Sequence, residues 1–277
     1  MHSLKKSINK TLLYLFLTVS SIIAAFPLVW IILSAFKTGN EINNNPLQIL
    51  PKTWSLENFR YVLLELNFGT NIKNSLIVAL GTTLITIIVS GLGAYAIVRF
   101  FPRIGQVLTK LLITTYMFPT ILLAIPFSVI IGQFNLIDSY IGLIVVYLSF
   151  SVPYAIWLLV GFFETVPIGI EEAARIDGAN KWQVFTKIVL PVVAPGITAT
   201  AVYTFINAWN EFLYGLILIN SRGKMTISVA LNALENQEIF NWGHMMAAST
   251  LVVLPSVIFF LLIQSRISGG LTEGSVK

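Results

Sequence analysis

The chain has 277 residues, of which 56% are hydrophobic and only 10% charged, and its mean hydropathy is +0.83. Soluble domains carry about 25% charged residues, so this composition indicates a membrane protein. Cysteine is absent, which excludes disulfides, thiolate metal sites and thiol nucleophiles. The two histidines, His2 and His244, are too far apart in sequence for a local metal motif, and a net charge of +5 fits a membrane-embedded chain better than a nucleic-acid-binding one.

Six apolar runs are each long enough to cross a bilayer, which takes roughly 20 residues. They lie at about 11–36, 73–98, 108–132, 139–163, 192–219 and 243–265. The first run follows a lysine-rich start but is much longer than a signal-peptide core of about 7–15 residues, so we expect a retained anchor. The sequence therefore predicts an all-α membrane protein with six transmembrane helices, in a single domain over residues 1–277. Prolines within several runs are expected to kink these helices.

The basic residues predict the orientation of these spans, because Lys and Arg favour the cytoplasmic side. With both termini inside, eleven of the seventeen Lys and Arg residues fall in inner segments and six in outer ones. We therefore expect a multi-pass protein with cytosolic N and C termini. This orientation places a loop at about 164–191 in the cytosol.

That loop contains the segment EEAARIDGANKWQVFTKIVLP, residues 171–191, whose pattern predicts two short helices joined by a glycine. Pro167 can occupy a first helical turn, and Glu171 and Glu172 then lie where the helix dipole favours negative charge. Gly178 permits the positive φ that ends a helix and reverses the chain. We expect an exposed acidic pair beside small alanines, which suits a groove on a soluble partner.

The second predicted helix carries an apolar stripe of Trp182, Phe185 and Val189. An amphipathic hairpin lying on lipid headgroups is an alternative that these residues leave open. Membrane-surface helices favour Lys and Arg on their polar face, so the acidic pair fits that alternative poorly.

The spacing of Glu172-Ala173-Ala174, Gly178, Ile188 and Leu190-Pro191 resembles the complete EAA loop of ABC importer permeases. Asp177-Gly178-Ala179 matches the version common in the carbohydrate branch. The likeness extends over nearly the whole chain through Trp54, Asn58-Phe59, Asn74-Ser75, Ala94-Tyr95-Ala96, Arg99-Phe100, Trp209-Asn210-Glu211-Phe212, Gly270-Leu271-Thr272 and Gly274-Ser275-Val276-Lys277. Glu273 and Ser275 depart from it, because alanines are usual there. The chain is thus similar to the smaller permease of maltose-type or multiple-sugar importers.

This resemblance implies a type I ABC importer permease fold with a cytosolic coupling loop, in a bacterial plasma membrane. The implied partners are a second homologous permease, two cytosolic ATPase subunits, an extracytoplasmic sugar-binding protein and membrane lipid, with no nucleic acid. ATP and Mg would bind to the ATPases, since this chain has no G-x-x-x-x-G-K-[ST] phosphate loop. The chain itself is expected to hold no cofactor or metal, to have no catalytic residues and not to be an enzyme. The implied ATPase-coupling residues are Glu171, Glu172, Ala173, Ala174, Asp177, Gly178, Ala179, Trp182, Phe185, Ile188, Leu190 and Pro191.

A second candidate site lies in the fifth apolar run, where a charge at membrane depth is costly unless it is paired or hydrated. Its residues are Tyr203, Asn207, Trp209, Asn210 and Glu211. Aromatic rings beside amide and carboxylate groups suit a sugar path, and Asn207 and Glu211 lie four residues apart on one helix face. Pairing of Glu211 with the partner permease or a backbone group is an equally open interpretation.

A self-contained secondary transporter or channel is the competing function. It would need ion-coupling acids or half-helix ion sites in several spans, often with internal repeats. Only Glu211 is clearly intramembrane in the sequence, and we find no repeat.

The orientation can be tested with single cysteines, because the chain has none of its own. Asn44→Cys should react with an impermeant thiol reagent added to intact cells, and Lys181→Cys should not. Labelling of Lys181→Cys from outside would overturn the predicted topology.

Overall fold

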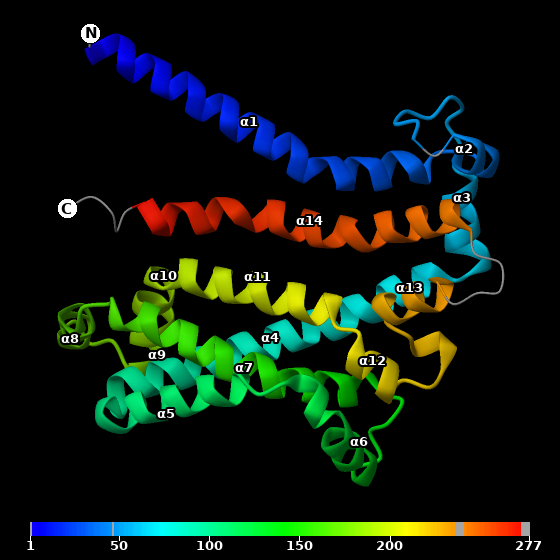
Figure 1. Ribbon diagram of the computed structural model, residues 1–277. Helices are drawn as coiled ribbons and strands as arrows, with labels where there is room; N and C mark the ends of the chain where they lie inside the picture. Colours follow the sequence, from blue (N-terminus) through cyan, green and yellow to red (C-terminus); the bar gives the residue numbers. More distant parts are fainter. Residues whose placement is uncertain (1, 46, 236–240, 273–277) are drawn as a thin grey trace. The chain divides into compact units, whose positions relative to one another are not determined.

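The computed structural model describes residues 2–45, 47–235 and 241–272, and every regular element in these ranges is helical (Figure 1). In chain order they are α1 (His2–Ala35), α2 (Gly39–Asn44), α3 (Glu57–Arg60), η1 (Tyr61–Glu65), α4 (Phe68–Phe100), α5 (Pro102–Tyr116), η2 (Thr120–Leu123), α6 (Ala124–Gln133), α7 (Tyr140–Glu164), α8 (Ile168–Ile176), α9 (Lys181–Gln183), η3 (Val184–Val189), α10 (Leu190–Val192), α11 (Ala194–Asn210), α12 (Leu213–Leu218), η4 (Arg222–Lys224), α13 (Ile227–Glu235) and α14 (Trp242–Thr272). The part of the family likeness at 273–277 lies outside the described residues.

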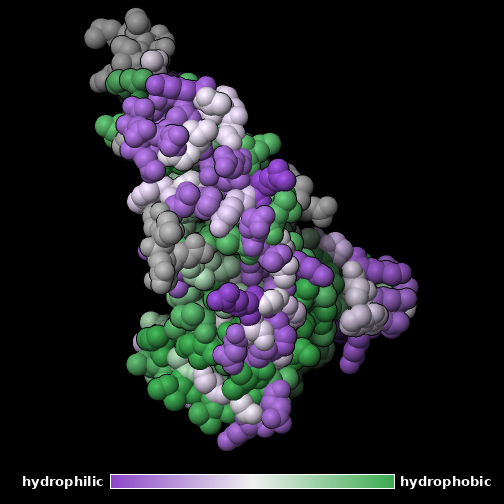
Figure 2. All heavy atoms as spheres, turned by 90° about the vertical axis from the view of Figure 1, so that its right-hand side faces the viewer, coloured by the Kyte–Doolittle hydropathy of each residue, from purple (hydrophilic) through white to green (hydrophobic). Residues whose placement is uncertain are grey.

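Four described helices are long and apolar enough to cross a membrane: Lys10–Ala35, Phe68–Phe100, Tyr140–Glu164 and Trp242–Leu261. Two bent pairs pass the same test together, with an angle of 87° between Pro102–Tyr116 and Thr120–Gln133, and of 75° between Lys181–Val192 and Ala194–Asn210. Counting each pair as one span gives the six predicted from the sequence. Large hydrophobic areas lie on the exposed surface beside hydrophilic ones (Figure 2), as expected of helices that face lipid.

Local backbone chemistry explains where the chain departs from straight helices. Pro119 has no N–H to continue a helix, and its extended conformation (φ −60°, ψ 118°) separates α5 from η2 and α6. The segment predicted as one span at 192–219 contains two helices, because Glu211 is extended (φ −65°, ψ 130°) between α11 and α12. Apolar residues flank both breaks, so hydropathy alone does not reveal them.

The chain divides into two compact units, Met1–Gly69 with Leu231–Val253, and Thr70–Ala230 with Leu254–Lys277. In the first unit, the buried Asn58 amide donates hydrogen bonds to the carbonyl oxygens of Ala35 (3.0 Å) and Lys37 (2.8 Å), which satisfies the end of α1. The single domain expected over 1–277 stays a prediction.

The second unit contains both candidate sites, and α7 is at its centre, packed against α5 and α11. A Cβ atom on Gly196 would overlap the ring of Phe162, so α11 reaches α7 only because this residue is glycine. This close approach brings together the two ends of the loop that joins α7 to α11.

Candidate functional site

The loop between α7 and α11 has the predicted form of two short helices separated by a glycine. Pro167 precedes α8, and Gly178 follows it with φ +89°, which confirms the predicted positive φ. Asn180 then caps α9, accepting a bond from the Gln183 N–H while the Gln183 side chain accepts one from the Asn180 N–H. The second predicted helix is one α-turn followed by the π-helix η3.

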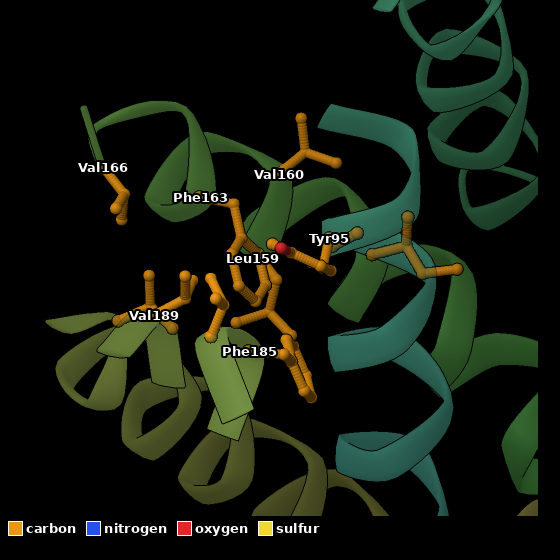
Figure 3. Close-up of a cluster of buried hydrophobic side chains, with 11 residues drawn as sticks. Tyr95, Leu159, Val160, Phe163, Val166, Phe185 and Val189 are labelled. Atoms are coloured by element: carbon orange, nitrogen blue, oxygen red, sulfur yellow. The ribbon is translucent and has the colours of Figure 1, made fainter. Parts of the chain in front are cut away.

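The second half of the loop is anchored in the hydrophobic core. Phe185 and Val189 of η3 are buried and gather with Leu159 and Phe163 of α7, and Tyr95 joins them from α4 (Figure 3). The predicted stripe is therefore correct for Phe185 and Val189. Trp182 lies outside this core with 63% of its surface exposed, although its ring is 5.7 Å from that of Phe185.

The first half of the loop is exposed and mixes charge with apolar surface. Glu172 and Asp177 are exposed, and Ile176 between them is 87% exposed. A shallow hollow of about 350 Å³ adjoins them, lined by Asp177, Gly178, Ala179, Gln183, Lys187 and Ile188. This surface offers a soluble partner both shape and charge.

The prediction of an exposed acidic pair is wrong for Glu171, which is 1% exposed. Its Oε1 accepts a bond from Arg99 Nε at 2.5 Å, and its Oε2 accepts one from the Tyr95 hydroxyl at 2.7 Å. Consecutive helical residues point about 100° apart, so Glu171 faces α4 while Glu172 faces outward. Sequence reasoning named Tyr95 and Arg99 only as part of the family likeness and did not place them beside the loop, although the charge of Arg99 at the end of the second apolar run was a signal.

The coupling residues implied by the sequence thus divide by exposure. Exposed are Glu172, Ala173, Asp177, Gly178, Trp182 and Pro191; partly buried are Ala174, Ala179, Ile188 and Leu190; buried are Glu171 and Phe185.

The second candidate site is a cavity of about 160 Å³ beside the break between α11 and α12. It brings together three of the five predicted residues, Tyr203, Asn207 and Glu211. Residues that sequence reasoning missed complete its lining: Tyr116, Thr120, Tyr147, Phe150, Ser151, Ala208 and Tyr214. Trp209 and Asn210 do not line it, since Trp209 is fully buried against Phe205 and Asn210 is exposed elsewhere.

Glu211 both holds the helix break and lines this cavity. Its carboxylate accepts bonds from the Tyr147 hydroxyl (2.5 Å), the Tyr214 N–H (2.9 Å) and the Gly215 N–H (3.2 Å). The last two are free N–H groups at the start of α12, where a carboxylate is favoured. Pairing with backbone groups, one of the two interpretations left open by the sequence, is therefore correct, and a sugar path along Glu211 stays a prediction.

Tyr203, which lines the same cavity, belongs to an aromatic cluster. The Tyr203 ring stacks on Tyr154 with centroids 4.1 Å apart, and its hydroxyl is hydrogen-bonded to that of Tyr116. The exposed Asn207 amide donates to the Tyr203 carbonyl at 2.8 Å, which leaves its own oxygen free to accept. Hydroxyl, amide and carboxylate groups thus converge beside aromatic faces.

An ion pair fastens the connection between α6 and α7 to the segment after α12. Lys224 Nζ lies 2.9 Å from Asp138 Oδ2, and the Ser221 hydroxyl donates to the same oxygen at 2.6 Å. Hydrogen bonds from the Ser221 hydroxyl and N–H, and then from Lys224, hold the pKa of Asp138 well below its usual range.

A bundle of apolar helices with a cavity that aromatic and polar side chains line, and with an anchored, exposed loop, is the architecture of a membrane permease. The model of the family "Binding-protein-dependent transport system inner membrane component" matches residues 87–272, and the chain belongs to this family. It is accordingly a membrane-embedded permease subunit of an ABC importer and not itself an enzyme. This membership sets aside the self-contained secondary transporter or channel.

Individual relatives cover almost all of the chain. The inner membrane ABC transporter permease protein YcjP of Escherichia coli (strain K12) is 33% identical over 275 residues, which span 99% of this chain and 98% of that protein. The trehalose/maltose transport system permease protein MalG of Thermococcus litoralis is 33% identical over 274 residues, which span 98% of each. A bacterial ABC transporter involved in the import of the acidic polysaccharide alginate has a chain of the same fold, with a TM-score of 0.78 and 21% identity over 94% of this chain and 97% of that one.

Proposed function

We propose that this permease forms half of the path by which a sugar or oligosaccharide, delivered by an extracytoplasmic binding protein, enters the cell. The saccharides named for the Thermococcus permease and for the alginate transporter support this substrate class. So does the cavity at Glu211, which combines aromatic faces with hydroxyl, amide and carboxylate groups, as saccharide recognition requires.

The other half of the path belongs to a second, homologous permease, and two cytosolic ATPase subunits bind ATP and Mg²⁺ and power transport. Both termini of this chain lie in the cytosol, as the excess of Lys and Arg in the inner segments favours. The loop between α7 and α11 then also lies on the cytosolic side, within reach of the ATPases.

The loop couples the ATPases to the membrane helices, and the observation that carries this proposal is its two-sided construction. Phe185 and Val189 bury one side in the core, while Glu172, Ile176 and Asp177 present the other side to the cytosol. A loop that only connected two helices would not need an apolar residue exposed between two acids.

A hairpin on the membrane surface is the competing function of the loop, favoured by the exposed Trp182 and Ile176. Headgroup-bound helices gain from cationic polar faces, whereas the exposed charges around Ile176 are mixed in sign, with Glu172 and Asp177 beside Arg175 and Lys181. A groove on a protein can pair charges of both signs, which a layer of anionic headgroups cannot, so a protein partner fits this surface better.

Gly178→Val tests the coupling function directly. A β-branched residue at φ +89° is strained by about 1–3 kcal/mol, and the loop backbone will shift to relieve it. No neighbouring atom lies within 4 Å of the added Cβ, so the membrane helices should still fold. In the reconstituted complex we expect ATP hydrolysis to respond weakly to the loaded binding protein, and sugar uptake to be lost.

Gly178→Asn is the matched control, because asparagine tolerates positive φ far better than valine. It should retain much more activity than Gly178→Val. Normal hydrolysis and uptake in Gly178→Val would mean that the loop is only a connector.

Asn207→Ala tests the path. It removes an exposed amide that lines the cavity, so complex yield should be normal while the substrate concentration for half-maximal uptake rises. Trp209→Ala instead empties a fully buried site, and truncation of a buried Trp costs about 3–5 kcal/mol, so complex yield and melting temperature should fall. Wild-type uptake kinetics in Asn207→Ala would assign the sugar contacts to the partner permease.

A further inference from the structure

The C-terminal end of α4 is hydrogen-bonded to the coupling loop through buried polar side chains. Besides its bond to Glu171, Arg99 donates from Nη2 to the Val166 carbonyl at 2.7 Å. The Tyr95 hydroxyl binds the second Glu171 oxygen, and only 11% of the Arg99 side chain and 2% of the Glu171 side chain are exposed. We call Tyr95, Arg99 and Glu171 the α4 clamp.

Attachment of the loop does not by itself require this clamp. The apolar cluster around Phe185 and Val189 already holds the loop against α7. Buried ion pairs are often no more stabilising than the apolar residues that could replace them. What charge-assisted bonds add is direction, because they fix the orientation of α8 relative to α4.

The N-terminal end of α4 holds a second segment, residues 223–227, in the same way. The buried Asn74 amide donates to the carbonyl oxygens of Gly223 (2.9 Å) and Met225 (3.0 Å). The Ile227 N–H donates to the Ser75 hydroxyl at 2.7 Å. Polar side chains thus bind α4 at each end to segments distant in sequence.

The helix between these ends is suited to transmit movement. It has 33 residues, so it is about 50 Å long and its ends lie on opposite sides of a hydrocarbon layer about 30 Å thick. Its sequence contains no proline, whereas α1, α7 and α14 contain Pro27, Pro153 and Pro255. Sharp helix kinks occur at proline and at Gly/Ser pairs, but α4 remains one continuous α-helix through its Ser90-Gly91 pair, so it should move as a rod.

We propose that α4 is a rigid connection between the coupling loop and the 223–227 segment, with Tyr95 and Arg99 as positioning residues. Movement of the loop shifts α4 through the clamp, and α4 carries the shift across the membrane to residues 223–227. Occupancy of the extracytoplasmic side is signalled to the ATPases by the reverse route. This inference rests on the proposed contact between loop and ATPases.

The test uses the complete complex in lipid vesicles and measures ATP hydrolysis with and without loaded binding protein, as a ratio to each variant's own basal rate. Glu171→Gln at one end of α4 and Asn74→Ala at the other should each reduce this stimulation about tenfold, within the range for residues along a coupling network. Tyr95→Phe, which removes one hydroxyl, should reduce it about threefold. Glu164→Gln, an equal charge change at an exposed residue ending α7, should keep wild-type stimulation.

The double variant Glu171→Gln with Asn74→Ala distinguishes coupling through α4 from two unrelated local effects of the substitutions. If α4 connects the sites, stimulation in the double variant should equal that of the more impaired single variant, because either change already breaks the route. Two results would overturn the proposal. One is a double variant whose loss of stimulation is the product of the two single losses. The other is wild-type stimulation with a lowered melting temperature in the single variants, as expected of a purely structural contact. If Glu171→Gln does not assemble, Tyr95→Phe carries the same comparison.

Different results would contradict the proposed function and the proposed connection through α4. A wild-type complex without stimulation would contradict the proposed contact between loop and ATPases. A stimulated wild type with unaffected clamp variants would contradict the connection through α4 alone.

Discussion

A carboxylate buried in a protein interior must be paired, and the pairing of Glu171 with Arg99 and Tyr95 determines the orientation of the loop between α7 and α11. Once Glu171 faces α4, helical geometry turns Glu172 outward, and Gly178 reverses the chain so that Phe185 enters the core. The exposed and buried sides of the loop both follow from this orientation. The same contact links the loop to α4, which is distant from it in sequence.

Glu211, at the helix break between α11 and α12, is a second carboxylate whose charge is satisfied by hydrogen bonds within the chain. A carboxylate there would be costly in lipid, but the free N–H groups of Tyr214 and Gly215 and the Tyr147 hydroxyl satisfy it. The interrupted helix makes room for the cavity, and the charge that stabilises the interruption also lines it. Substitution of Glu211 would therefore disturb the helix break as well as the cavity, which is why Asn207 is the better probe of the proposed path.

Much of the fold could be predicted from the sequence, because an apolar run of about 20 residues has few alternatives to a membrane helix. The loop was predictable because glycine and proline restrict the backbone, and the positive φ of Gly178 followed from that chemistry. The breaks near Pro119 and Glu211 were less accessible, since apolar neighbours hide them from hydropathy. Tertiary partners were not predictable: nothing local in the sequence shows that Glu171 turns toward Arg99.

Coupling requires the outward side of the loop to touch an ATPase. A photo-crosslinking residue at Ile176, which is 87% exposed, should yield a covalent product with the ATPase in cell membranes. The same residue at Ile104, which is 60% exposed in α5 and outside the loop, should give no such product. Products with lipid alone from both positions would contradict the account and favour a loop that rests on the membrane surface.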